Sequence, residues 1–197
     1  MPLDLKFDFH VVEEFFDHRT CRNLIDEIRR SETSAALTFV KHDSGYVDES
    51  TRKVKRAVLN LETTRWVTTR LHEHLPRLCE HFEVRLSAIE EPQFLWYGPG
   101  DFFVAHQDGN TKLIQLESDR LRRTSLTIFL NPQSDDDDEE SYSGGSLVFT
   151  DRLTGDVCEI RGETGKLVAF RPELTHEVKP IQRGNRFTVV TWCRIVA

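Results

Sequence analysis

No apolar run in this 197-residue chain approaches the roughly 18 to 20 residues that a bilayer-spanning helix needs. Its start, MPLDLKFDFH, lacks the basic segment and apolar core of a secretory signal. Cysteine is also sparse: the 4 cysteines are scattered without a CxxC pair, which argues against a zinc knuckle or a redox pair and favours reduced thiols. These absences predict a cytoplasmic protein with no membrane partner.

An excess of charge of one sign is confined to a single segment. The net charge is −7, and the DDDDEE run at 135–140 supplies most of it, so the rest of the chain is nearly neutral. Without a broad basic face we expect no nucleic-acid partner. We interpret the acidic run as a solvated loop between strands, and two small basic clusters likewise as solvated loops. These clusters are Arg52, Lys53, Lys55 and Arg56, and Arg120, Arg122 and Arg123.

Two segments in the first 92 residues have helical periodicity. A short apolar stripe, Leu24, Ile25 and Ile28, follows the segment 13–17. A longer stripe recurs at spacings of three and four residues and includes Pro76, which can kink a helix. The members of this longer stripe are Val67, Leu71, Leu75, Leu78 and Phe82.

Short runs rich in β-branched and aromatic residues dominate from about residue 93 onward. So many short strands indicate a sandwich or barrel with a double or closed sheet. We therefore predict a mainly β protein with N-terminal helices, a single domain over 1–197 in which 1–92 gives helical support and the first strands and 93–197 the core. The expected strands are 38–41, 54–60, 93–97, 102–108, 124–130, 146–150, 157–160, 167–170, 176–179 and 186–195.

The candidate chemistry centres on His106 and Asp108, which share one face if the strand continues through them. His176 opens a later strand. Two histidines and one carboxylate on adjacent strands can occupy one face of a metal octahedron, the arrangement of non-haem Fe(II) oxygenases. The same residues also suit a mononuclear zinc hydrolase or a structural hydrogen-bonded group.

Arg186 and Thr188 share a face of the last strand. An inward arginine is costly to bury without an anionic partner. A dicarboxylate bound to the metal would supply that partner through a charge-assisted contact. A zinc hydrolase does not explain this arginine, so the oxygenase interpretation is favoured.

Five segments carry a family resemblance in their order and spacing: LWYGPGDFFVAHQDGN, RTSLTIFLN, SGGSLVF, LVAFRPELTHEV and GNRFTVVTW. The sequence resembles the 2-oxoglutarate and Fe(II)-dependent dioxygenases of the prolyl 4-hydroxylase type, over most of its length and best between residues 94 and 193. This resemblance implies a double-stranded β-helix, or jelly roll, with helices packed on one sheet. It also implies that His106, Asp108 and His176 bind iron.

The resemblance further implies how the co-substrates are held. Arg186 would anchor 2-oxoglutarate, the Tyr97 phenol would contact it, and Thr188 matches a hydroxyl position of related oxygenases. Oxygen would be the second co-substrate, and ascorbate would serve as reductant. The sequence departs from many relatives at Phe103 and Phe129, where they have tyrosine. We therefore expect a more apolar pocket that holds 2-oxoglutarate with fewer hydrogen bonds.

The substrate implied by the resemblance is a prolyl residue of a peptide or protein, hydroxylated with release of succinate and CO2. A free amino acid or small metabolite is the alternative, and no residue discriminates between them. We expect a monomer or homodimer, and a loop at 39–56 that closes over the site. The remaining histidines show no ligand spacing on a common face and are expected at the surface. They are His10, His18, His42, His72, His74 and His81.

Overall fold

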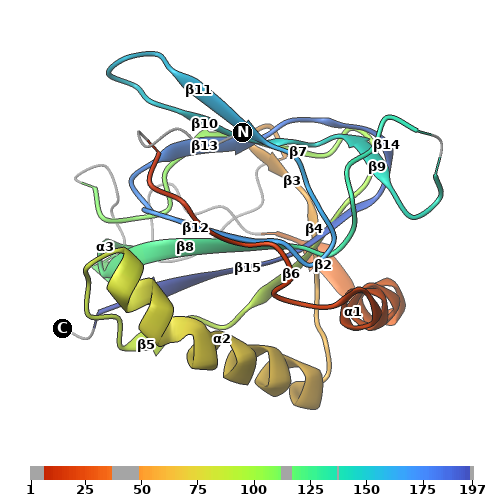
Figure 1. Cartoon of the computed structure of the whole chain (residues 1–197). Coiled ribbons are helices and arrows are strands. Elements are labelled where there is room, and N and C mark those ends of the chain that lie inside the picture. The colour runs from red at the N-terminus through yellow and green to blue at the C-terminus, as the bar shows by residue number, and fades with distance from the viewer. Residues whose placement is uncertain (1–6, 37–48, 112–116, 137, 196–197) are drawn as a thin grey trace.

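The computed structural model describes residues 7–36, 49–111, 117–136 and 138–195 (Figure 1). Its helices are α1 (His18–Arg30), α2 (Leu61–His81) and the short α3 (Glu117–Arg120). The strands are β1 (His10–Val12), β2 (Thr33–Ala35), β3 (Arg52–Lys53), β4 (Lys55–Ala57), β5 (Ala88–Ile89), β6 (Gln93–Tyr97), β7 (Phe102–His106), β8 (Arg122–Phe129), β9 (Tyr142–Gly144), β10 (Leu147–Thr150), β11 (Val157–Ile160), β12 (Leu167–Phe170), β13 (Thr175–Val178), β14 (Ile181–Gly184) and β15 (Arg186–Arg194).

Both long helices begin at a capping side chain. The Asp17 carboxylate accepts from the Thr20 amide at the start of α1, and the Asn60 side chain accepts from the Thr63 amide at the start of α2. Pro76 lies within α2, which nevertheless continues to His81. The predicted helices are therefore confirmed, and their predicted stripes supply the buried residues. Those residues include Leu24 and Ile28 of α1, and Val67, Leu71 and Leu78 of α2.

The strands form two principal antiparallel sheets. The larger has 8 strands in the order β1-β12-β8-β15-β6-β4-β2, with β5 paired to β15. The smaller has 5 strands in the order β11-β10-β13-β7-β3, and β14 and β9 form a separate pair. The prediction of a mainly β protein with N-terminal helices is confirmed.

The layers follow from the alternation of side chains along the strands of the larger sheet. Leu126 and Ile128 of β8 pack in a core cluster with α1 and α2, whereas Phe129 belongs to a second cluster shared with the smaller sheet. Figure 1 shows the helices on one side of the larger sheet and the smaller sheet on the other. On β15, Phe187 and Val189 pack in the helical cluster, so Arg186 lies on the opposite face, between the sheets.

Several expected strands match the structure and others differ from it. The expected strands 93–97, 157–160 and 167–170 coincide with β6, β11 and β12. The expected strand 54–60 is confirmed only at 55–57, which form β4, because the chain passes there from β3 in the smaller sheet to the larger one and then turns into α2. The expected strand 102–108 ends at residue 106. The expected strand 38–41 lies outside the described residues, as do residues 39–48 of the expected loop.

No helix in the described ranges is both long and apolar enough to cross a bilayer.

Candidate metal centre

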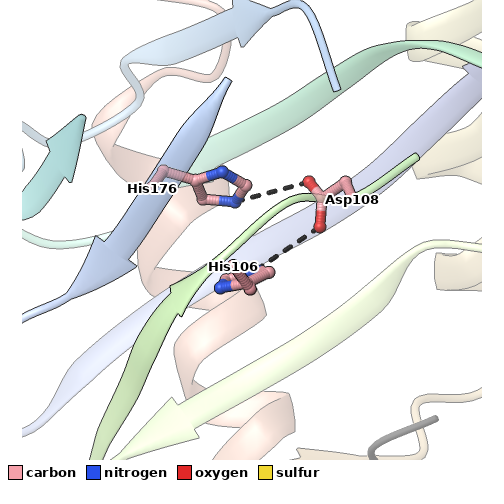
Figure 2. A group of neighbouring side chains, drawn as sticks. All are labelled: His106, Asp108 and His176. Atoms are coloured by element: carbon pink, nitrogen blue, oxygen red, sulfur yellow. Dashed lines mark ion pairs between the residues drawn. The ribbon is translucent and has the colours of Figure 1, made fainter. Parts of the chain in front are cut away.

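The three predicted metal-binding side chains converge between the sheets (Figure 2). His106 at the end of β7 and His176 on β13 are direct partners in the antiparallel register. Asp108 lies beyond β7, where its amide donates to the Pro172 carbonyl at 2.8 Å. Its Oδ1 is 3.5 Å from His106 Nε2 and its Oδ2 is 3.4 Å from His176 Nε2. Asp108 therefore reaches the site by leaving the strand.

Hydrogen bonds to the backbone orient both imidazole rings. His106 Nδ1 is 2.8 Å from the Val104 carbonyl, and His176 Nδ1 is 2.9 Å from the Leu174 carbonyl. A carbonyl oxygen only accepts, so each Nδ1 carries the proton and each Nε2 of a neutral ring presents a lone pair to Asp108. Acceptors then face one another across the site, which a cation between them would relieve. The donor set fits a metal ion.

The site also favours the protonation states that metals require. Burial, together with the neighbouring His106, lowers the pKa of His176 to about 4. Burial alone would raise the pKa of Asp108, but its polar contacts, among them a hydrogen bond from Trp192, outweigh burial and hold that pKa below its usual range. At neutral pH the protein thus offers a neutral His176 and an ionised Asp108.

A second polar site lies at Arg186, on the same face of β15 as Trp192. Arg186 is only 2% exposed, and its guanidinium carbon is 5.0 Å from the Tyr97 ring centre and 5.2 Å from that of Phe129. Neither its Nε nor the buried Thr188 hydroxyl has a hydrogen-bond partner among the described residues. A buried cation is costly without a counter-ion, and no ion pair is found for Arg186 in the described ranges, so its surroundings favour an anionic group. The structure thus brings Arg186, Tyr97 and Thr188 together as the sequence predicts.

The sequence comparisons agree with this geometry. A family model described as the 2OG-Fe(II) oxygenase superfamily matches residues 92–194. The chain belongs to this superfamily. PKHD-type hydroxylases of Cupriavidus pinatubonensis and Paracoccus denitrificans are each 32% identical to it over 107 residues. These matches cover 54% of the chain but only 43% and 44% of the two relatives, so the match spans less than half of either protein.

Solved structures share the fold of this superfamily member. A Pseudomonas putida prolyl-4-hydroxylase matches with a TM-score of 0.74 at 22% identity, covering 97% of this chain and 94% of that one. A Trichoplax adhaerens prolyl hydroxylase, solved with a peptide fragment of the hypoxia inducible factor oxygen degradation domain, also gives a TM-score of 0.74, at 17% identity. That match covers 95% of this chain and 83% of the other.

The metal centre has an outer layer of side chains that the sequence did not reveal. Arg122 donates to the Asp108 carbonyl at 2.9 Å, and its guanidinium carbon lies 4.0 Å from the centre of the Trp192 ring. Glu90 accepts two hydrogen bonds from the same guanidinium, at 2.8 and 2.7 Å. Our interpretation of Arg122 as part of a solvated loop is therefore wrong. It is a largely buried cation that braces Asp108 and the ring that hydrogen-bonds it.

The other basic cluster also differs from expectation. Arg52 is 9% exposed, and its guanidinium carbon lies 4.8 Å from the centre of the Phe103 ring. That ring stacks on His106 with 3.6 Å between ring centres. Arg52 therefore belongs to a layered stack beside the metal centre, not to a solvated loop. Its neighbours Lys53 and Lys55 are exposed, as expected for lysines at a surface.

The expectation of surface histidines also fails at His74. This residue is 7% exposed, and its Nε2 is 2.8 Å from Nε2 of His10. His81 packs against His10 with 5.0 Å between ring centres and pairs with Asp8. Among the described residues, however, only His106, Asp108 and His176 bring three metal-donor atoms within 4.8 Å of one another. His42 lies outside the described residues.

Proposed function

We propose that this chain is an Fe(II)- and 2-oxoglutarate-dependent dioxygenase that hydroxylates a substrate C–H bond. The observation that carries the proposal is the facing set of His106, Asp108 and His176 acceptor atoms, which would hold the iron and leave its other positions open. The scaffold we propose is a single-domain jelly roll with its helices on one sheet. The overall reaction converts 2-oxoglutarate, O2 and R–H to succinate, CO2 and R–OH.

The residues of the chain have distinct parts in this scheme. When bound, iron supplies the redox chemistry that couples oxidative decarboxylation of 2-oxoglutarate to substrate oxidation, with ascorbate as a reductant. Arg186 would bind the distal carboxylate, with Tyr97 and Thr188 beside it. Aromatic rings at Phe103 and Phe170 pack against the two histidines and would exclude water from the reaction.

For the substrate we propose a prolyl residue in a peptide or protein. The support is that the sequence relatives are named PKHD-type hydroxylases and that structures sharing the fold are prolyl hydroxylases, one of them holding a peptide. Oxidation of a free amino acid or small metabolite is the alternative. Proline-containing peptides and free amino acids, each followed by mass spectrometry for a gain of one oxygen atom, separate these two substrate classes.

The reaction itself is tested with purified protein supplied with Fe(II), ascorbate, oxygen and 2-oxoglutarate. We expect succinate to form, at least as slow turnover without substrate, and to be abolished in His106→Ala, Asp108→Ala and His176→Ala. His72→Ala is the matched control, because His72 is exposed on α2 and should retain full turnover. A hydrolytic activity sustained by zinc, with no succinate under iron and oxygen, would refute the proposal.

A further inference from the structure

Tyr142 on β9 has a buried hydroxyl whose polar neighbour is the Arg186 guanidinium, which only donates, so its O–H has no acceptor among the described residues. The residue is 0% exposed, so bulk water does not reach this hydroxyl. Burying a polar group without a partner costs free energy, and native proteins rarely leave such a group unused. A ligand that accepts a hydrogen bond from the Tyr142 hydroxyl would remove this cost.

Two glycines seat this phenol beside the Arg186 side chain. A Cβ at Gly145 would lie 3.2 Å from Tyr142 Cε2 and 3.3 Å from Arg186 Cδ, so both side chains pack on the same backbone. A Cβ at Gly162 would lie 2.1 Å from the Tyr142 hydroxyl, so only glycine leaves room for that oxygen. Burial raises the pKa of Tyr142, and the Arg186 cation opposes this shift. The hydroxyl thus lies protonated within the field of the guanidinium.

The buried polar atoms near the Arg186 side chain share one property, the ability to donate a hydrogen bond. Arg186 Nε, the Tyr142 hydroxyl and the Thr188 hydroxyl are all buried, and none of them donates to an acceptor among the described residues. Each can donate a hydrogen bond, and a carboxylate has two oxygens that accept several. Phe129 contacts the same guanidinium but carries no hydroxyl.

From this arrangement we infer that the Tyr142 hydroxyl donates a hydrogen bond to the distal carboxylate of 2-oxoglutarate, alongside Arg186. Tyr142 is then a residue that determines selectivity for a co-substrate ending in a carboxylate. The inference rests on the proposed function, because it takes 2-oxoglutarate as the ligand. It would also give Arg186 a phenol neighbour that donates, although Phe103 and Phe129 stand where many relatives have tyrosine.

The test is anaerobic calorimetric titration of the Mn(II)-loaded protein with two ligands. One is 2-oxoglutarate, and the other is 2-oxopentanoate, in which a methyl group replaces the distal carboxylate. Since hydrogen bonds to charged groups are stronger than neutral ones, Tyr142→Phe should weaken 2-oxoglutarate binding by about 10- to 100-fold. Its affinity for 2-oxopentanoate and for Mn(II) should change less than about twofold, because neither contact involves the hydroxyl.

Thr124→Val is the matched control. Thr124 also has a buried hydroxyl with no described partner, and it shares the face of β8 with Leu126, toward the helices. Its removal should leave 2-oxoglutarate affinity unchanged. The melting temperature of ligand-free Tyr142→Phe should stay equal to that of the wild type or rise, whereas loss of a structural hydrogen bond would lower it.

The outcomes separate this inference from the proposed function. Wild-type protein that does not bind 2-oxoglutarate would overturn both. Wild-type protein that binds it while Tyr142→Phe binds equally well, or loses the same factor with both ligands, would overturn the role of Tyr142 and leave the proposed function standing. A lower melting temperature of the ligand-free variant would assign the hydroxyl a structural role instead.

Discussion

Replacing Arg122 should destabilise the protein and loosen the metal centre together. The side chains of Arg122 and Glu90 are 13% and 19% exposed and are joined by two short hydrogen bonds. Arg122→Met would leave the Glu90 carboxylate buried without its partner, and breaking a buried ion pair in this way typically costs about 3 to 5 kcal/mol. Because both groups retain some contact with water, we expect a loss near the lower value, about 3 kcal/mol.

The same substitution also removes a donor to the Asp108 carbonyl and the cation stacked on Trp192. Loss of such outer contacts commonly weakens metal binding by about 10- to 100-fold. We expect Arg122→Met to melt roughly 6 to 12 °C lower, since about 1 kcal/mol corresponds to 2 to 4 °C in a domain of this size. Differential scanning calorimetry gives the first quantity, and anaerobic titration with Fe(II) or Mn(II) gives the second.

Two further variants sharpen the test. Arg123→Met removes the neighbouring guanidinium, which donates to backbone carbonyls of residues 120 and 122, and should cost less than about 1 kcal/mol. Combining Arg122→Met with Glu90→Gln should recover part of the lost stability, because no unpaired carboxylate remains. If Arg122→Met were as stable as Arg123→Met and bound metal as tightly as the wild type, the bracing role of Arg122 would be refuted.

Three other substitutions have defined outcomes. Arg186→Ala should weaken 2-oxoglutarate binding at least tens of fold in calorimetry and leave metal affinity intact, since breaking a buried charge contact costs about 2 to 5 kcal/mol. Arg186→Lys should restore only part of that affinity, and an unchanged affinity in Arg186→Ala would remove the anchor role. Replacing residues 135–140 by a neutral linker should leave succinate formation and melting temperature nearly unchanged, because the Asp135–Arg161 pair in this run is exposed. A large loss of turnover would instead place the run near the iron. Acidification from pH 7 to 5 should lower the melting temperature, because burial and His10 lower the pKa of His74 to about 4 and the unfolded chain therefore binds protons first. His74→Phe should reduce this dependence without abolishing it, because the pKa of His176 is also lowered to about 4.

The sequence was most informative where one periodicity extends over a long segment, or where a charged residue on the inner face of a strand needs a polar partner. The stripe from Val67 to Leu78 predicted α2 because a buried helix face repeats regularly. Histidine, aspartate and arginine on expected strands predicted which side chains would meet between the sheets, since inward charges need partners. Asp108 reached the site by a different route, through a backbone hydrogen bond beyond the end of β7.

What the sequence did not predict depends on contacts between distant segments. Arg122 and Arg123 are adjacent arginines, yet the first is buried because β8 places it against Glu90, 32 positions earlier in the chain. Tyr142 carries no local pattern that marks its hydroxyl as buried, because the Gly162 that makes room for it belongs to another strand connection. The short strands β1 and β5, of 3 and 2 residues, are below the length at which alternation is detectable.

The division of the site between two sheets has a consequence for co-substrate length. His106 and His176 stand on the smaller sheet, whereas Arg186 stands on the larger one. A co-substrate that contacts both the metal and Arg186 must therefore be long enough to reach from one sheet to the other. The spacing of the sheets depends on rings such as Phe149 and Phe170, whose centres are 4.8 Å apart. The same two rings pack against His176, so they hold one end of the site as well as the spacing between the sheets. Smaller side chains at these rings should therefore change which dicarboxylate spans the site, while the Arg186 end keeps its contacts with Tyr97 and Phe129.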